Sequence, residues 1–256
     1  MTSRPLSEAK WLPATLGLGA LGTTLALIEL AIRIEWVSRF IVPLPSDVLM
    51  SFERIIREED VLSRFLATAG EALAAALLVS LIGVALGALL HGNRLLRRAC
   101  ESWVAGLAAA PLVLLYPLFL VIFGRNALTI VMIGFVSGLP PAILKTVEGF
   151  SGTRKVLLDV GRSFSLSPSQ QFWKIRFPSA LPVIFVGVRL GLMFSLINIV
   201  GVEFLINFGG LGQLVNELAE RYDLAAMYAA ICFVILVSVC FFIASERLER
   251  WLLRAS

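Results

Sequence analysis

The residues of this 256-residue sequence that could do chemistry are a few polar side chains within long apolar stretches. Placing such groups in a lipid bilayer is costly, so they commonly mark the path of a polar solute or ion. The alternative is structural: each side chain pairs across a helix interface or reaches the membrane surface from a helix end. Asn198 and Glu203 are the strongest candidates for a translocation pathway, because they share the apolar stretch that follows the longest polar connection. The complete set is Glu29, Glu71, Arg189, Asn198 and Glu203.

Catalytic and metal-binding motifs are absent from the sequence. His91 is the only histidine, and Cys100, Cys232 and Cys240 lack the paired spacing of a metal site. The sequence contains no H-E-x-x-H or G-x-S-x-G motif, which disfavours an intramembrane enzyme. It also lacks the phosphate-binding loop G-x-x-x-x-G-K-S/T, so we expect neither ATP hydrolysis nor a bound cofactor or metal on this chain.

The composition is that of a membrane protein. Hydrophobic residues make up 58% of the chain and charged residues 16%, with a mean hydropathy of +0.88, whereas a soluble domain is about 45–50% apolar and about 25% charged. A water-soluble core of this size cannot bury that surplus, so lipid must solvate much of it. The net charge of +4 agrees with basic residues in cytoplasmic loops and predicts no nucleic-acid partner.

Apolar stretches long enough to cross a bilayer, about 20 residues each, occur six times. The first is too long for the apolar region of a secretory signal and ends in Ile-Arg-Ile-Glu-Trp instead of small residues, so we predict a retained span. The sequence therefore predicts an all-α integral membrane protein, with a single transmembrane domain over residues 1–256. The six predicted spans are residues 11–32, 65–90, 102–123, 127–145, 180–206 and 224–244.

The distribution of Lys and Arg predicts that both termini are cytoplasmic. In that orientation the inner segments, beginning with Arg4 and Lys10, hold 14 basic residues and the outer segments hold 7, as the positive-inside rule requires. The first outer segment fits this rule least well, because it carries five Arg. It is predicted to contain an amphipathic surface helix over residues 46–59, with Ser46 and Asp47 capping its start.

The longest inner connection, residues 148–178, is patterned as two helices around a turn. The second predicted helix begins at Ser167, where a capping serine, Pro168 at the first helical position and Gln170 form a capping box. It is predicted to end before Pro178. A loop that merely links two spans needs no such caps, so the pattern favours a structured projection that docks on a cytoplasmic partner. The first predicted helix, residues 153–164, has apolar residues at helical spacing: Val156, Leu157, Val160 and Phe164.

This connection resembles the EAA loop of the permeases of binding-protein-dependent ABC importers. The resemblance rests first on residues 158–167 and 172–182, and it extends over about residues 41–250. Further segments resemble the nitrate, sulfonate and taurine branch of these permeases. They are residues 42–46, Pro111 and Pro117, residues 123–124, Gly149, and residues 187–191, 202–203 and 209–212.

The chain departs from the family pattern at several positions of this loop. The acidic lead position is Asp159 instead of Glu, and the two small positions are Val160 and Gly161. The turn position that usually holds glycine is Ser165, for which a left-handed conformation costs about 1 kcal/mol relative to glycine. The resemblance assigns ATPase coupling to this element, and the residues concerned are Asp159, Val160, Gly161, Ser165, Leu166 and Ser167.

The resemblance implies a type I ABC importer permease, with six transmembrane helices and a cytoplasmic coupling loop between the fourth and fifth, in the bacterial inner membrane. It implies as partners two ABC ATPase subunits, which hold ATP and magnesium, and a periplasmic or lipid-anchored substrate-binding protein. It also implies a second permease copy, which we expect to form a homodimer. The implied substrate is a small nutrient such as a sulfonate, nitrate, taurine or a vitamin precursor. The alternative is an ion-coupled secondary transporter, which would need acidic residues deep in several spans and often an inverted repeat.

Overall fold

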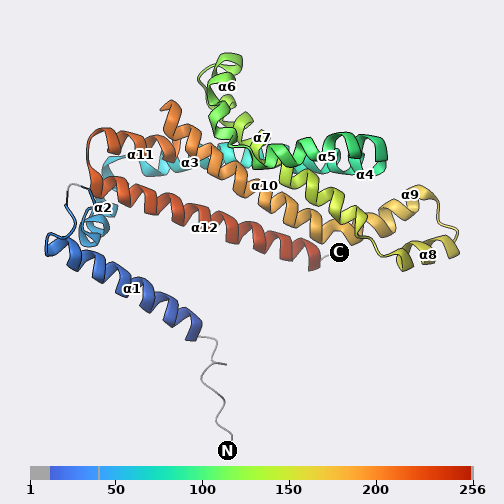
Figure 1. Ribbon diagram of the computed structural model, residues 1–256, viewed down its shortest axis with the longest axis horizontal. Coiled ribbons are helices and arrows are strands. Elements are labelled where there is room, and N and C mark those ends of the chain that lie inside the picture. Colours follow the sequence, from blue (N-terminus) through green and yellow to red (C-terminus); the bar gives the residue numbers. More distant parts are fainter. Residues whose placement is uncertain (1–11, 40, 255–256) are drawn as a thin grey trace, which may run out of the picture.

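The computed structural model describes residues 12–39 and 41–254, and all regular secondary structure in these ranges is helical (Figure 1). Trp11, where the first predicted span begins, and the basic residues Arg4 and Lys10 lie outside the described residues. The elements are α1 (Leu12–Arg33), α2 (Pro45–Glu58), α3 (Val61–Leu78), η2 (Val79–Gly83), α4 (Val84–Gly92), α5 (Arg94–Ala109), η3 (Leu112–Leu115), α6 (Tyr116–Phe123), α7 (Ala127–Ser151), α8 (Lys155–Ser163), α9 (Pro168–Gln171), η4 (Phe172–Arg176), α10 (Phe177–Ile206), α11 (Gly210–Glu220) and α12 (Leu224–Arg254).

Five helices in the described part of the chain are long and apolar enough to cross a membrane, and they confirm five of the six predicted spans. Two of these helices run through π-helical turns without interruption: α3 continues through η2 into α4, and α9 continues through η4 into α10. The five spanning segments are Thr15–Arg33, Val61–Gly92, Ala127–Ser151, Pro168–Ile206 and Leu224–Trp251.

The third predicted span, residues 102–123, is not one straight helix. The chain forms α5 and then, after a break at Ala110 and Pro111, η3 and α6, and the two halves meet at an angle of 93°. Proline disfavours helical backbone in the residue before it, and Ala110 accordingly has φ −76° and ψ 138°. Hydropathy, from which the span was predicted, does not depend on this backbone break and therefore gives no sign of the bend. Counting the bent pair as one broken span gives six.

The predicted helix end before Pro178 is also wrong, because helical backbone continues from α9 into α10. Pro178 is the second residue of α10, within this continuous run, and proline lacks the N–H of a helical hydrogen bond. The π-helical turn η4 directly before it changes the hydrogen-bonding register. One continuous helical run, Pro168–Ile206, therefore joins the predicted docking projection to the fifth predicted span.

Helices α7 and α10 approach closely at the centre of the bundle. A Cβ on Gly138 would lie 2.6 Å from the carbonyl oxygen of Gly191, and a Cβ on Gly191 would lie 2.6 Å from that of Gly138. In the same crossing the Ser195 hydroxyl donates to the carbonyl oxygen of Gly134 at 2.6 Å. Small residues allow such close association of helices in membranes. The contact holds α7 against the helix that continues from the projection.

Helix α2 lies at the end of the bundle opposite α8 and α9 (Figure 1). It confirms the predicted amphipathic helix, but the predicted cap is wrong. Pro45 occupies the first helical position and starts the helix one residue earlier, since its fixed φ suits that position. The Ser46 hydroxyl donates instead to Oε1 of Glu29 at 3.2 Å. Because Glu29 also pairs with Arg33 at 2.6 Å, this contact ties the end of α1 to α2.

Helix α11 occupies the stretch between the fifth and sixth predicted spans, for which no helix is predicted. Leu211, Leu214 and Leu218 recur at helical spacing, and each is 1% exposed. They pack in one cluster with residues of α2, α3 and α12. The ion pair of Arg64 with Glu217, at 2.7 Å, joins α3 to α11 beside this cluster. These contacts make α11 part of the bundle.

Candidate functional site

The residues that the resemblance assigns to ATPase coupling lie on one projection, the knob, which we define as residues 155–176 (Figure 1). Helix α8 ends there in a Schellman motif. The N–H of Ser165 donates to the carbonyl oxygen of Arg162 at 2.8 Å, and the N–H of Leu166 donates to that of Gly161 at 3.0 Å. These bonds satisfy carbonyl groups at the helix end and give the turn a defined geometry.

The two residues on either side of Leu166 complete the turn. Ser165 has a φ of 54°, so serine adopts here the left-handed conformation that glycine usually provides. Ser167 confirms the predicted capping box: its N–H donates to Oε1 of Gln170 at 2.9 Å, and the N–H of Gln170 donates to its hydroxyl at 3.3 Å. The departure at Ser165 therefore leaves the turn formed.

The knob is packed on itself through a glycine. A Cβ on Gly161 would lie 2.5 Å from Cδ1 of Ile175, so the small residue lets α8 lie against η4. The side-chain amide of Gln171 donates to the carbonyl oxygen of Leu166 at 3.2 Å. These two contacts join the helices on both sides of the turn and make the knob one unit.

One face of α8 is apolar and exposed. Val156, Val160 and Phe164 follow each other at intervals of four residues and are 70%, 48% and 75% exposed. Trp173 of η4 is 61% exposed. An apolar stripe on an amphipathic helix normally faces a core, yet nothing in the described part of the chain covers this one. Exposed apolar surface of this kind is typical of an interaction site.

The structure brings the six assigned coupling residues together on the knob, in different surroundings. Gly161 is buried and Leu166 is half-buried, whereas the other four are exposed. Asp159 pairs with Arg162 at 3.1 Å, and because both are more than half exposed the pair adds little stability. Asp159 therefore faces solvent and is accessible to a partner.

Glu203 lies fully buried where α10, α3 and α11 meet. Its Oε1 accepts a hydrogen bond from the Thr68 hydroxyl at 2.7 Å, and its Oε2 accepts one from the N–H of Gly212 at 2.8 Å. The Thr68 hydroxyl oxygen accepts in turn from the N–H of Leu211 at 2.9 Å. The Glu203 carboxyl group and the Thr68 hydroxyl thus each accept from one backbone N–H at the start of α11, where such groups lack partners within the helix.

Glycines allow α11 to approach this carboxyl group. A Cβ on Gly210 would overlap the carboxyl group of Glu203, and a Cβ on Gly212 would overlap the carbonyl oxygen of Val200. These glycines belong to the segment 209–212, which carries part of the family resemblance. Sequence reasoning missed Thr68 as a partner of Glu203, although it lies one helical turn before Glu71, which is 9% exposed.

The two candidate pathway residues do not share a surface. Glu203 is fully buried among three helices, whereas Asn198 is half-buried, and its side-chain amide donates to the carbonyl oxygen of Phe194 at 2.9 Å within α10. The geometry of Glu203 corresponds to the structural alternative, a polar group paired across helix interfaces. Asn198 stays a candidate for contact with a polar solute.

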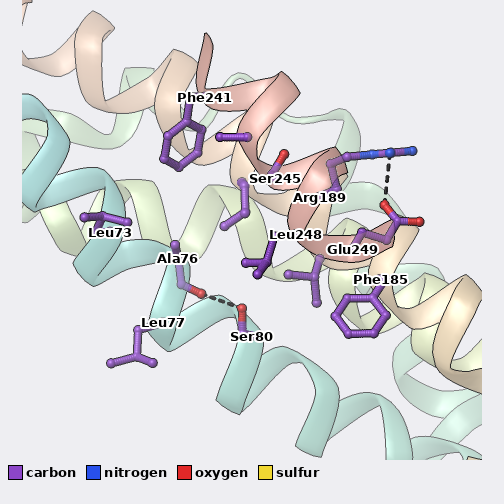
Figure 2. Close-up of a pocket in the computed structure, with 13 residues that line it drawn as sticks. Leu73, Ala76, Leu77, Ser80, Phe185, Arg189, Phe241, Ser245, Leu248 and Glu249 are labelled. Atoms are coloured by element: carbon purple, nitrogen blue, oxygen red, sulfur yellow. Dashed lines mark hydrogen bonds and ion pairs between the residues drawn. The ribbon is translucent and has the colours of Figure 1, made fainter. Parts of the chain in front are cut away.

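Arg189 lies at one end of a cavity of about 420 Å³ between α3, α10 and α12 (Figure 2). Apolar side chains such as Leu73 and Phe241 form most of its wall. Arg189 pairs with Glu249 at 3.0 Å, with side chains 22% and 14% exposed, and its guanidinium lies 5.4 Å from the ring centre of Phe242. The pairing of Arg189 across helices is confirmed. Its partner was not identified because Glu249 lies beyond the predicted sixth span.

The described residues hold no group of three or more His, Cys, Asp or Glu side chains arranged to bind a metal ion. Cys100, Cys232 and Cys240 are free thiols. The arrangement offers an exposed apolar surface on the knob and polar contacts between helices.

Comparison with protein families finds one profile match, described as "Binding-protein-dependent transport system inner membrane component", over residues 61–254. The chain is 27% identical to a nitrate import permease protein of Synechocystis sp., over 59% of this chain and 57% of the relative. It is 27% identical to a riboflavin transport system permease protein of Chloroflexus aurantiacus, over 63% of this chain and 60% of the relative. The chain therefore spans less than two thirds of the length of these relatives.

Two further similarities cover most of both proteins. A probable ABC transporter permease protein of Brucella abortus is 22% identical over 84% of this chain and 88% of the relative. Among solved structures, an inward-facing MetNI methionine ABC transporter chain superposes with a TM-score of 0.65 at 18% identity, covering 74% of this chain and 94% of that chain. At this identity the structural likeness establishes the fold.

Proposed function

Because this chain belongs to the family of binding-protein-dependent transport system inner membrane components, we propose that it is the membrane-spanning permease subunit of an ABC importer. The exposed apolar face of the knob is the observation that carries the proposal. A cytoplasmic ATPase subunit would cover Val156, Val160 and Phe164 and receive the turn at Leu166 in a groove. ATP and magnesium would be held by two such ATPase subunits and not by this chain.

The continuous helical run Pro168–Ile206 supports a mechanism for coupling. Closure of the ATPase subunits would move the knob, and α10 would carry this movement along its whole length because no loop interrupts it. At the far end of α10, Glu203 ties the helix to α3 and to the start of α11. Movement at the knob would therefore reach α11 without an intervening flexible joint.

The proposed orientation places the knob in the cytoplasm of a bacterial cell, with the chain in the inner membrane and both termini inside. The end of α12 lies toward the knob end of the bundle (Figure 1), which supports a cytoplasmic C-terminus. A second copy of the chain would complete the pathway, with Asn198 as a candidate for contact with the solute. A periplasmic or lipid-anchored binding protein would deliver the substrate near α2 and α11.

The proposed substrate is a small nutrient of the nitrate, sulfonate, taurine or vitamin-precursor type. The names of the nitrate and riboflavin relatives support this range. The wall of the 420 Å³ cavity is mainly apolar, and its charged residues Arg189 and Glu249 already neutralise each other. The choice within the range therefore rests on the relatives.

Co-purification with a co-expressed ABC ATPase tests the proposal. Phe164→Glu places a charge on the apolar face of α8 without disturbing the packing of the knob, because Phe164 is 75% exposed. Wild-type permease is expected to retain two ATPase subunits through size-exclusion chromatography in detergent, and Phe164→Glu is expected to release them.

Leu95→Glu is the matched control. Leu95 is 78% exposed near the start of α5, where an acidic side chain is compatible with the helix dipole, and it lies outside the knob. This variant is expected to keep its ATPase subunits. Equal retention by wild type and Phe164→Glu would contradict docking at the knob. A wild type that retains no ATPase subunit would favour a transporter that needs no ATPase.

A further inference from the structure

A hollow of about 690 Å³ lies between the knob and the turn that joins α4 to α5. Four basic residues from three different segments line it: Arg94 of α5, Lys155 and Arg162 of α8, and Arg176 of η4. Asp159 is the one acidic residue in the lining, and it is already paired with Arg162 at 3.1 Å.

The other three cations have no carboxylate partner in the part of the chain that the structure describes. Arg94, Lys155 and Arg176 form no ion pair there, whereas most Arg residues of α2, α3 and α12 do. Like charges that line one hollow repel each other, and a bound anion would relieve the repulsion. The hollow therefore has the charge of an anion site, with a geometry assembled from residues far apart in the sequence.

The position of the hollow indicates where the anion would come from. His91 and Ser151, which also line it, lie at the ends of two spanning segments, and Arg176 lies just before α10. The His91 ring is 5.4 Å from that of Phe150, which stacks on Phe172 at 5.5 Å. These ring contacts join the end of α4 to α7 and η4 around the hollow. Because spanning segments end near the bilayer surface, the ends of two such segments at the hollow correspond to the level of lipid headgroups.

We propose that this hollow binds a phosphate group, as carried by the headgroup of an anionic phospholipid or by a free phosphate compound. Basic pockets at the cytoplasmic side of spanning helices bind anionic headgroups. A phosphate here would join the α4–α5 turn to α8 and so hold the knob in place relative to the spans. The site does not depend on the transported substrate, and it can be tested on the permease without ATPase or transport.

The test measures thermal unfolding of the purified full-length permease in detergent during titration with phosphatidylglycerol, phosphatidylcholine or inorganic phosphate. Phosphatidylglycerol is expected to raise the melting temperature of the wild type more than phosphatidylcholine. Each basic residue near an anionic lipid surface gives about a fivefold gain in binding. Arg94→Gln combined with Arg176→Gln is therefore expected to raise the half-saturating lipid concentration about thirtyfold.

The matched control combines Arg98→Gln with Lys174→Gln, which removes the same charge from the same two segments at exposed positions outside the lining. This control is expected to respond to phosphatidylglycerol as the wild type does. Stabilisation by inorganic phosphate equal to that by phosphatidylglycerol would support the site and assign it to free phosphate compounds. Equal loss of response in both double variants, or no difference between the two lipids for the wild type, would overturn the proposal.

Discussion

Replacing Thr68 by valine tests whether the buried tie between α3, α10 and α11 stabilises the protein. Valine has nearly the same shape as threonine, so the substitution opens no cavity, but it removes the hydroxyl group. Oε1 of Glu203 then loses its donor at 2.7 Å, and the N–H of Leu211 loses its acceptor at 2.9 Å. The hydroxyl also lies 3.3 Å from the carbonyl oxygen of Arg64, but that contact is longer and the carboxyl group is the stronger acceptor.

The magnitude follows from the two buried groups that are left without a partner. Leaving a buried polar group unsatisfied costs about 1–3 kcal/mol, while hydrogen bonds between membrane helices average about 0.6 kcal/mol. Because both groups are enclosed among the helices, Thr68→Val is expected to lower the free energy of unfolding by about 2–4 kcal/mol. Thr68→Ser keeps the hydroxyl and loses one methyl group, which costs about 1 kcal/mol.

The assay is reversible unfolding of the purified permease in mixed micelles of a mild detergent and dodecyl sulfate. A cycle that adds Glu203→Gln to Thr68→Val separates the specific tie from general loss of packing, because residues in one hydrogen-bonded network have non-additive effects. The reasoning is refuted if Thr68→Val and Thr68→Ser differ by less than about 0.5 kcal/mol, the usual effect of a neutral substitution.

Three further substitutions test other contacts in the same unfolding assay or by hydrogen exchange. Gly191→Ala forces a methyl group against the α7 backbone and is expected to destabilise the protein by about 1–3 kcal/mol. Gly201→Ala is the control and should be tolerated, because a Cβ there would lie 3.4 Å from its nearest neighbour. Equal effects of the two substitutions would contradict the close crossing of α7 and α10. Glu249→Gln leaves Arg189 unpaired and is expected to lower the free energy of unfolding by about 1–3 kcal/mol. The double variant Arg189→Glu with Glu249→Arg should recover part of this loss. No loss of stability in Glu249→Gln would show that the pair is dispensable. Ser165→Gly removes the cost of the left-handed conformation of serine, about 1 kcal/mol. This gain in local stability is expected to slow amide hydrogen exchange in the turn about fivefold, and faster exchange would contradict the expectation.

The spans and the caps of the knob depend on patterns local in the sequence, and these were predicted well. Five of the six predicted spans are confirmed. They could be predicted because a spanning helix needs about 20 consecutive residues that are mainly apolar, and such a stretch is visible directly in the sequence. The capping box at Ser167 and Gln170 is confirmed for the same reason, since its partners are three residues apart. The six residues to which the resemblance assigns ATPase coupling lie together on the knob, and their role in coupling stays a prediction.

The outcome at Pro111 shows what composition alone cannot predict. Residues 102–123 are apolar enough to span a bilayer, and yet the chain turns by 93° within them. Hydropathy sums over a window and is insensitive to the backbone restriction that one proline imposes on its neighbour. Helix α11 was missed for a related reason, because its eleven residues are too few and too polar for a span.

The sequence by itself determined that the chain is an all-helical membrane protein with a capped projection, because those properties follow from hydropathy and from contacts between near neighbours. Only the tertiary structure decided what the polar residues do. The sequence indicates Glu203 as a candidate pathway residue, but its carboxyl group accepts hydrogen bonds from Thr68, 135 positions away, and from the N–H of Gly212 in α11. The energy of a buried polar group depends on whether such partners surround it, and helices distant in the sequence supply them only once the bundle is packed.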